Sequence, residues 1–399
     1  MTVVGIIAEY NPFHTGHEYH IKKIREEFGE DTVIVAVMSG SFTQRGELAI
    51  FDKTVRAKAA VKSGVDLVLE LPFPFSCAGA EFFAEAGVRI LDSLGAVDYV
   101  SFGSECGTLE TLYACAEVLS AEKIKKSETH DARGYAEKCA ELCDVVGTEN
   151  SELFKSNNIL AIEYIKALKK LKSKMKPHTV KRLGSSYSDE CITENAYPSA
   201  MAIRKAINDG DLSALDYVPK ATKDIYLSAI ANQAAPTDKK RLDAAVISSL
   251  RLNSPDADIH DAKGGLYNRI RSMSFSADSI SSLIELTKTK KYTTARIRRA
   301  VWYSYIGVTS SDVKRMPTYT QVLAMSSRGA ALLKRIKSGA EIPILTKPSK
   351  TDTLGCDACY AKALADRADS VFQLAKPAMG SAYEWLRFTP FVEKENIPR

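Results

Sequence analysis

Three of the six histidines lie close together near the start of the chain, within the stretch N-P-F-H-T-G-H-E-Y-H of residues 11–20. His14 and His17 are three residues apart, and Gly16 stands between them. Two imidazoles at this spacing can face one anion and donate hydrogen bonds to the charge that develops when a phosphorus centre is attacked. Gly16 leaves room for a nucleotide to lie against the backbone. The pattern therefore predicts a site for chemistry at a phosphate.

Two other interpretations of these histidines stay open. Histidines on a surface turn need no ligand at all. Zinc could use His14, His17 and His20, because ligands three residues apart can meet at one ion. However, H-T-G-H straddles a turn and lacks the H-E-x-x-H pattern, in which two ligands share a helix face with a carboxylate between them. Zinc binding would also leave the neighbouring strand and glycine unexplained.

The first half of the chain alternates between short apolar runs and amphipathic runs. The apolar runs suit strands of a parallel sheet buried on both faces, and they cover residues 3–10, 32–38, 65–72 and 96–103. The amphipathic runs predict crossover helices, and they cover residues 17–28, 52–64 and 80–95. This order predicts an α/β fold with a doubly wound parallel sheet.

Such a sheet binds its ligands at the carboxyl ends of the strands. Residues 11–14 fall in the turn after the first strand, and Gly16 and His17 open the next helix. The start of a helix offers unpaired N–H groups and a partial positive charge, both of which favour a phosphate. The expected fold and the histidines therefore point to the same site.

Composition predicts a globular protein of two or three domains. With 399 residues, of which 45% are hydrophobic and 26% charged, the chain can bury a large core. No apolar run approaches the roughly 18 to 20 residues of a membrane helix, and the apolar start carries Glu9 and lacks a basic segment with a cleavage site. The eight scattered cysteines suit reduced thiols. We therefore expect a cytoplasmic protein without a membrane partner.

Strand signals become sparse after about residue 205. Helical patterns take their place, for example over residues 331–337 and 360–375. We therefore predict two parts, a nucleotide-binding domain over residues 1–205 and a mainly helical region over residues 206–399.

A basic stretch within the second part indicates binding to nucleic acid. The net charge of +5 is weak evidence, but residues 288–337 contain twelve lysines or arginines and one acidic residue. Tyrosines and a tryptophan interleave with the basic residues and could stack on bases or pack in a core. A solvated basic helix face is the alternative. The candidate RNA contacts are Lys290, Lys291, Arg296, Arg298 and Arg299.

Cys356 and Cys359 have C-x-x-C spacing. No second pair and no nearby histidine completes a zinc site with four ligands. We interpret the two as incidental cysteines of a helix.

The stretch N-P-F-H-T-G-H resembles the HxGH motif of the HIGH-type nucleotidyltransferase superfamily, which has a Rossmann-like fold. The segment Y-P-S-A-M-A-I-R-K-A-I, residues 197–207, is similar to the second motif of that superfamily, usually ISSTxIR. Ser199 could cap the helix of this motif and meet a phosphate, and Arg204 supplies a permanent cation. Ala200 stands where a second hydroxyl is common.

Six blocks in order resemble the bacterial tRNA(Met) cytidine acetate ligase family up to about residue 350. They are EYNPFHTGHEYHI, MSGSFTQRGELAIFDKTVRAKAAVKSGVDLVLELP, FGSECG, SNNILAIEYIKAL, VKRLGSSYSD and TARIRRAVWYSYIGV. The resemblance implies that ATP and acetate form acetyl-AMP and pyrophosphate. The acetyl group then passes to N4 of the wobble cytidine, C34, of elongator tRNA(Met). It also implies Mg²⁺ with the ATP and a tRNA-binding second part, and no obligatory protein partner is evident.

The resemblance also assigns roles to individual residues. His14 and His17 would be catalytic, Gly103 would let the adenosine approach the backbone, and Arg182 would reach the phosphates. One asparagine of S-N-N-I-L would contact the nucleotide, and the sequence does not separate Asn157 from Asn158. The expected ATP contacts are Ile7, Ala8, Glu9, Tyr10, Asn11, Pro12, Phe13, His14, Thr15, Gly16, His17, His20, Gly103, Asn157, Asn158, Arg182, Ser199 and Arg204. No residue is assigned to a metal.

The residues leave two further classes of function open. A cofactor adenylyltransferase, which adenylates a phosphorylated vitamin or nucleotide, would use the same histidines but leave the basic second part without a role. A non-catalytic RNA-binding protein could retain the nucleotide fold, although the presence of both His14 and His17 argues against it.

Overall fold

The computed structural model describes residues 1–121, 155–182, 198–252, 258–382 and 388–393. The part of the sequence block V-K-R-L-G-S-S-Y-S-D that follows Arg182 lies outside these residues.

A central sheet carries the fold, with strand order β10-β8-β5-β2-β1-β6-β7 and with β9 paired to β8. All pairs are parallel except β5 with β8. The strands are β1 (Val3–Ala8), β2 (Val33–Ser39), β5 (Leu67–Leu71), β6 (Tyr99–Ser104), β7 (Lys176–Lys181), β8 (Thr320–Met325), β9 (Ile344–Leu345) and β10 (Phe391–Val392). The predicted doubly wound α/β fold is confirmed, and so are the four predicted strands.

The sheet is buried on both faces, which explains why its strands are almost continuously apolar. All seven residues of β2 are buried. Alternate residues point to opposite faces of a strand, so Val33, Val35 and Val37 join one core cluster. Ile34, Ala36 and Met38 join the other cluster.

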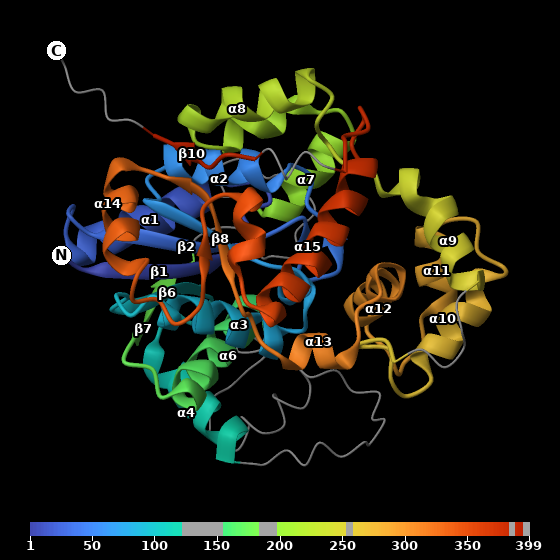
Figure 1. Cartoon of the computed structure of the whole chain (residues 1–399), viewed down its shortest axis with the longest axis horizontal. Coiled ribbons are helices and arrows are strands. Elements are labelled where there is room, and N and C mark those ends of the chain that lie inside the picture. Colours follow the sequence, from blue (N-terminus) through green and yellow to red (C-terminus); the bar gives the residue numbers. More distant parts are fainter. Residues whose placement is uncertain (122–154, 183–197, 253–257, 383–387, 394–399) are drawn as a thin grey trace.

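Helices cover both faces (Figure 1). The face that contains Ile34 packs against α1 (Thr15–Phe28), α2 (Lys53–Lys62), α7 (Ala200–Asn208) and α8 (Lys220–Ala231). The opposite face packs against α3 (Ala80–Ser93), α4 (Leu109–Ala121), α6 (Ser156–Leu171) and α14 (Ser327–Ile336).

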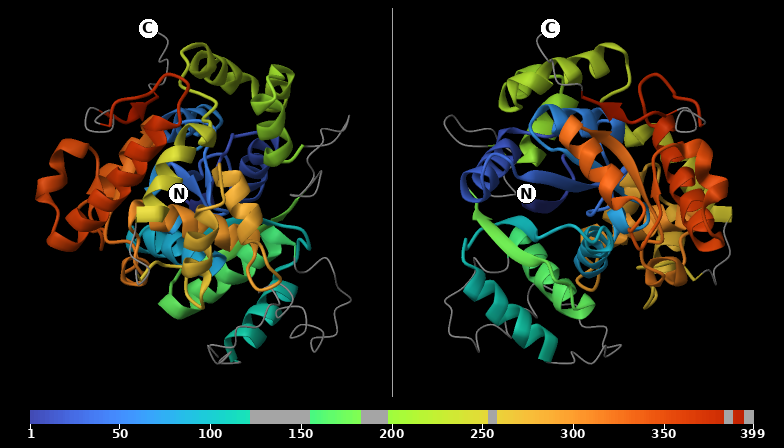
Figure 2. Two further views of the ribbon diagram at one scale, coloured as in Figure 1. Left: turned by 90° about the vertical axis from the view of Figure 1, so that its right-hand side faces the viewer. Right: turned by 60° about the vertical axis from the view of Figure 1, so that its left-hand side comes forward.

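A cluster of helices stands beside the sheet (Figure 2). It consists of α9 (Asp243–Leu252), α10 (Leu266–Ser274), α11 (Ile280–Thr287) and α12 (Thr294–Ile306), which pack on one another. The chain continues through α13 (Ser310–Lys314) and later forms α15 (Cys356–Leu374), which contacts α12. A hairpin of β3 (Phe42–Thr43) and β4 (Glu47–Leu48) stands apart from the sheet.

The second half of the chain contributes strands that the sequence interpretation missed. β8 inserts next to β5, and β10 pairs with β8. All but the last residue of β8 are buried. The predicted helices near 331–337 and 360–375 are confirmed as α14 and α15. The boundary near residue 205 stays a prediction, and residues on both of its sides form one sheet.

A buried ion cluster ties α15 to the first half of the chain. Lys53 Nζ lies 2.7 Å from Glu70 Oε1 and 2.5 Å from Asp369 Oδ2. Ser41 Oγ donates to Asp369 Oδ1 at 2.6 Å. Two carboxylates share one ammonium in a site closed to water, so the cluster depends on that single cation.

We predict that Lys53→Met destabilises the protein strongly, because Glu70 and Asp369 would be left buried without their cation. Removing one partner of a buried ion pair costs about 3–5 kcal/mol. Chemical denaturation should show a clearly lower midpoint. Lys334→Met, on the exposed side of α14, is the matched control and should change the midpoint little. An unchanged midpoint for Lys53→Met would contradict the role of the cluster.

Candidate active site

Two histidines cap the amino terminus of α1 by reciprocal hydrogen bonds. The Nδ1 atom of His14 accepts the N–H of Gly16 at 3.0 Å, and Nδ1 of His17 accepts the N–H of His14 at 3.2 Å. An imidazole nitrogen that accepts a backbone N–H carries no proton, so each neutral ring holds its proton on Nε2. Both rings therefore present an Nε2–H donor. A Cβ at Gly16 would lie 2.7 Å from His14 Cε1, so this position needs glycine.

Burial keeps both imidazoles neutral. Together with the charges of Arg182 and Arg204, it lowers the pKa of His14 from 6.5 to about 3. Burial and the neighbouring His14 lower the pKa of His17 well below 6.5. The ring centroids lie 3.9 Å apart, a distance at which two positive charges would repel strongly. The pair therefore offers hydrogen bonds to an anion without carrying a charge.

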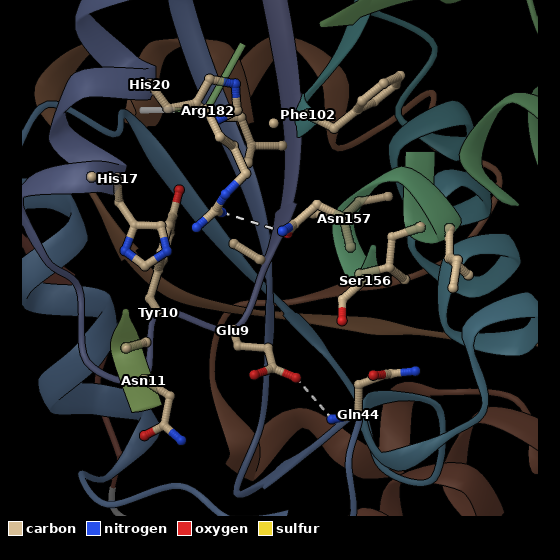
Figure 3. Close-up of a pocket in the computed structure, with 18 of the residues that line it drawn as sticks. Glu9, Tyr10, Asn11, His17, His20, Gln44, Phe102, Ser156, Asn157 and Arg182 are labelled. Atoms are coloured by element: carbon tan, nitrogen blue, oxygen red, sulfur yellow. Dashed lines mark hydrogen bonds between the residues drawn. The ribbon is translucent and has the colours of Figure 1, made fainter. Parts of the chain in front are cut away.

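The histidines form part of the wall of a cavity of about 550 Å³. The cavity lies where β1, β6 and β7 end and where α1, α6 and α12 begin (Figure 3). The predicted ATP contacts that line it are Ile7, Ala8, Glu9, Tyr10, Asn11, His14, Gly16, His17, His20, Gly103, Asn157 and Arg182. The remaining ones, Pro12, Phe13, Thr15, Asn158, Ser199 and Arg204, are not among its described wall residues.

The two asparagines that the sequence could not separate have different environments. Asn157 lines the cavity, and its Nδ2 donates to Glu105 Oε1 at 2.7 Å. Asn158 is fully buried, and its Oδ1 accepts the backbone N–H groups of Glu105 at 2.8 Å and Cys106 at 3.3 Å. Asn158 therefore holds the loop after β6, and Asn157 is available to a ligand.

Gly103 and Arg182 form one side of the cavity. A Cβ at Gly103 would lie 3.2 Å from Arg182 Cγ. Arg182 Nη1 donates to Asn157 Oδ1 at 3.5 Å (Figure 3). The small residue thus leaves room for the aliphatic part of the Arg182 side chain at the end of β6, and both residues line the cavity.

The second superfamily motif supports the turn after β1. Ser199 caps α7 by accepting the N–H of Ala202 at 3.0 Å, which confirms the predicted cap. Arg204 is buried, and its Nη1 donates to the carbonyl of Asn11 at 2.9 Å. Arg204 therefore holds the turn that carries the histidines, and its charge helps to lower the pKa of His14.

His20 points its Nε2 toward Ser101, with 2.7 Å between Nε2 and Oγ. Ser101 in turn contacts His178 Nδ1 at 2.9 Å. The three histidines of the opening stretch thus use different partners, and no group of three or more His, Cys, Asp or Glu within the described ranges could hold a metal ion.

The structure adds wall residues to which sequence reasoning gave no role. Gln44 and Arg45 come from the turn of the β3–β4 hairpin, Ser156 from the start of α6, and Thr293 and Ala295 from the start of α12. All five lie in or next to the quoted sequence blocks, but no spacing rule connects such distant segments. The close approach of α12 to the histidine site appears only in three dimensions.

Arginines of the basic stretch form hydrogen bonds and ion pairs within the protein, which the composition does not reveal. Arg299 is buried, and its Nε donates to Asp261 Oδ2 at 2.6 Å. Arg296 Nε donates to the carbonyl of Asp261 at 2.8 Å, so the two arginines lie on one face of α12, and that face holds the loop around Asp261. Arg298 pairs with Glu47 at 2.6 Å. Arg299 is therefore unsuited to contact RNA.

The start of the stretch is open to a partner. Lys290 is exposed, and Lys291 is partly exposed, with its Nζ 3.0 Å from the carbonyl of Gly264. The interleaved rings of Trp302 and Tyr303 are buried and belong to the core. Of the two uses that the sequence left open for these aromatic residues, packing is therefore the one that the structure shows.

Cys356 opens α15 and is exposed, and Cys359 lies in the first turn of the same helix. The Sγ atom of Cys359 lies 3.3 Å from the carbonyl oxygens of Thr351 and Leu354. Their helical position is the one predicted. None of the described helices is long and apolar enough to span a membrane.

Residues 1–384 match the model of the HIGH Nucleotidyl Transferase family, which is the class that the doubly wound sheet and the capping histidines define. The tRNA(Met) cytidine acetate ligase of Thermoanaerobacter sp. (strain X514) is 40% identical over 361 residues, which are 88% of this chain and 90% of that protein. The protein of the same name from Acetivibrio thermocellus is 38% identical over 370 residues, 88% of this chain and 89% of that protein.

Solved structures of a related protein have the same fold as this chain. The crystal structure of Thermotoga maritima TmcAL (apo, form I) is 28% identical and superposes with a TM-score of 0.91, covering 99% of this chain and 100% of that chain. The structure of the same protein bound with alpha-thio ATP (Form II) gives a TM-score of 0.89. The chain therefore belongs to the tRNA(Met) cytidine acetate ligase family of HIGH nucleotidyltransferases. Because this is a family of enzymes, the non-catalytic interpretation is set aside.

We predict that His14 stays neutral, with its proton on Nε2, between pH 5 and pH 8. The unfolded chain binds this proton near pH 6.5 and the folded protein only near pH 3. The unfolded state thus binds more protons between these values, and the folded state loses stability as the pH falls from about 6.5 toward 3. NMR of ¹⁵N-labelled imidazoles should show no titration of His14 in the range from pH 5 to 8. An apparent pKa near 6.5 for this ring would contradict its burial.

Proposed function

We propose that the protein activates acetate with ATP and transfers the acetyl group to N4 of the wobble cytidine, C34, of elongator tRNA(Met). The observation that carries the proposal is the pair of Nε2–H donors of His14 and His17 at the wall of a cavity of about 550 Å³. A cavity of this volume is of the size that takes a ligand such as a nucleotide. The names of the relatives supply the acceptor and the acyl group.

The first step makes the acyl donor. An oxygen of acetate attacks the α-phosphorus of ATP and forms a new O–P bond. The bond between the α-phosphorus and the oxygen that bridges it to the β-phosphorus breaks, which releases pyrophosphate. The crowded phosphorus gains negative charge on its oxygens, and the two imidazoles and the amino terminus of α1 stabilise that charge. Arg182, the residue after β7, lines the same cavity and would contact the phosphates.

Activation is required by the acceptor. The exocyclic amine of cytosine is conjugated with its ring and is a poor nucleophile, so the acetyl group needs a good leaving group. Acetyl-AMP provides one, because AMP leaves as a stable phosphate monoester. Transfer then forms the N–C bond of N4-acetylcytidine and releases AMP. No thioester is needed.

The described residues of the cavity wall do not form a set of protein ligands for magnesium. Glu9 is the one carboxylate among the described wall residues, and its Oε1 already accepts the N–H of Gln44 at 2.9 Å. These residues do not fit a Mg²⁺ ion held mainly by the protein. Mg²⁺ would therefore enter bound to the phosphates of ATP.

The second candidate, a cofactor adenylyltransferase, would use the same donors with a phosphorylated acceptor. Pyrophosphate release separates the two functions. We expect release with ATP plus acetate, and none above background with ATP plus phosphorylated vitamins or nucleotides.

We predict that purified protein, ATP and isotopically labelled acetate place one labelled acetyl group on cytidine of tRNA(Met), as measured by mass spectrometry, with AMP and pyrophosphate formed in proportion. Acetyl-CoA without ATP should give no product. His17→Ala should reduce acetate-dependent exchange of pyrophosphate into ATP by about 10²–10³-fold, the usual loss for a donor to a developing charge. His260→Asn, which removes an imidazole outside the cavity wall, is the control. ADP and phosphate as products would place the reaction at another phosphorus.

We predict that Lys290→Ala with Lys291→Ala weakens tRNA binding while acetate-dependent pyrophosphate exchange continues. Fewer cations release fewer counterions, so the slope of log affinity against log salt should fall by about one for each lost phosphate contact. Lys334→Ala with Arg335→Ala removes two charges from α14 and is the matched control. Equal loss of binding in both double variants would show a general charge effect and contradict a specific surface at residues 290–291.

A further inference from the structure

The cavity has a second end, opposite the capping histidines. Glu9 and Gln44 lie there, away from His17, His20 and Arg182 (Figure 3). Arg45, which follows Gln44 in the hairpin, and the start of α12 at Thr293 and Ala295 also line the cavity. The donors proposed for the α-phosphate, His14, His17 and Arg182, do not lie at this end. This end of the cavity is therefore available for another part of the reaction.

Glu9 is held so that one of its carboxylate oxygens faces the cavity. Its Oε1 accepts the backbone N–H of Gln44 at 2.9 Å (Figure 3). Its Oε2 has no hydrogen-bond partner among the described residues. Burial raises the pKa of this carboxyl, while the charges of Arg204 and Arg45 oppose the shift. The result is a carboxylate with one free acceptor oxygen and more basicity than a solvated glutamate.

The other polar groups of the described wall cannot accept a proton easily. His14 and His17 present N–H groups, because backbone N–H groups occupy their Nδ1 atoms. Burial lowers the pKa of His20 to about 3, which makes that ring a very weak base. Burial also raises the pKa of the Tyr10 and Tyr164 phenols, so both stay protonated near neutral pH.

The approach to this end is continuous with the basic stretch. The β3–β4 hairpin is fastened to α12, because Trp302 Nε1 donates to the carbonyl of Gly46 at 3.0 Å and Arg298 pairs with Glu47. Lys290, which is exposed, lies just before Thr293 at the cavity wall. A polyanion on this stretch would therefore lie next to the start of α12, which lines the cavity.

We propose that this end of the cavity receives the cytosine base and that Glu9 is the general base of the acetyl transfer. The inference rests on the proposed function and names the residue that completes its second step. A carboxylate is a natural acceptor for the N4 amino group of cytosine. As N4 attacks the acetyl carbonyl carbon, the N–C bond forms, one N4 proton passes to Glu9 Oε2, and the bond between the carbonyl carbon and the phosphate oxygen breaks. The products are N4-acetylcytidine, AMP and a protonated Glu9, which returns its proton to solvent.

The test separates the two half-reactions in the full-length protein. Glu9→Gln keeps the shape and the acceptor for the Gln44 N–H but removes the base. In this variant we expect transfer from chemically made acetyl-AMP to tRNA(Met) to fall by about 10²-fold or more, the usual contribution of a general base. Acetate-dependent pyrophosphate exchange should fall far less than transfer, and the exchange that remains also reports that the variant is folded.

Glu85→Gln is the matched control, because Glu85 is a buried glutamate of α3 that pairs with Lys170 at 2.7 Å and does not line the cavity. It should transfer acetyl groups like the wild type. Wild-type transfer rates in Glu9→Gln, or an equal loss of exchange and transfer, would overturn the assignment of Glu9. A wild-type protein that makes acetyl-AMP but does not acetylate tRNA would instead refute the proposed function itself, so the two failures are distinguishable.

Discussion

The site depends on the pair of hydrogen bonds by which His14 and His17 cap α1. Each ring takes a backbone N–H that the helix itself cannot satisfy. This contact fixes the rings in place, sets the proton on Nε2 and aims two donors into the cavity. Because His14 is buried, His17 is half-buried and the ring centroids lie 3.9 Å apart, both rings must be neutral, and the fixed charge of Arg182 reinforces that state. The same contact thus positions the donors and sets their protonation.

The second half of the chain is built into the first half. β8 lies antiparallel to β5 within the sheet, and Asp369 of α15 shares the buried ammonium of Lys53 with Glu70. Trp302 of α12 holds the hairpin that carries Gln44. These contacts bring the start of α12 to the cavity wall. A basic segment and the histidine site therefore share one wall, so in the proposed reaction the tRNA could reach the adenylate without a large movement of the adenylate.

The cavity separates two opposite chemical requirements by distance. Phosphoryl chemistry needs donors, and it finds the neutral imidazoles at one end. Acyl transfer to an amine needs an acceptor for a proton, and Glu9 supplies one at the other end. Burial raises the pKa of the carboxyl and lowers the pKa of the imidazoles, because it disfavours the charged form of each. Burial in the same cavity therefore makes the Glu9 carboxylate more basic and keeps the imidazoles neutral, as the proposed steps require.

The sequence by itself determined the fold class, four strands of the sheet and the place of the histidines, because apolar periodicity and the short spacing H-T-G-H are local signals. It did not determine which asparagine faces the cavity, since the difference arises from the contacts of Asn158 with the loop after β6. Composition placed Arg299 among the RNA contacts, and only the fold pairs it with Asp261, 38 residues away. The interpretation of the sequence also missed β8, whose pairing with β5 joins segments about 250 residues apart. Tertiary structure decided these points because burial and charge pairing depend on neighbours that the order of residues does not reveal.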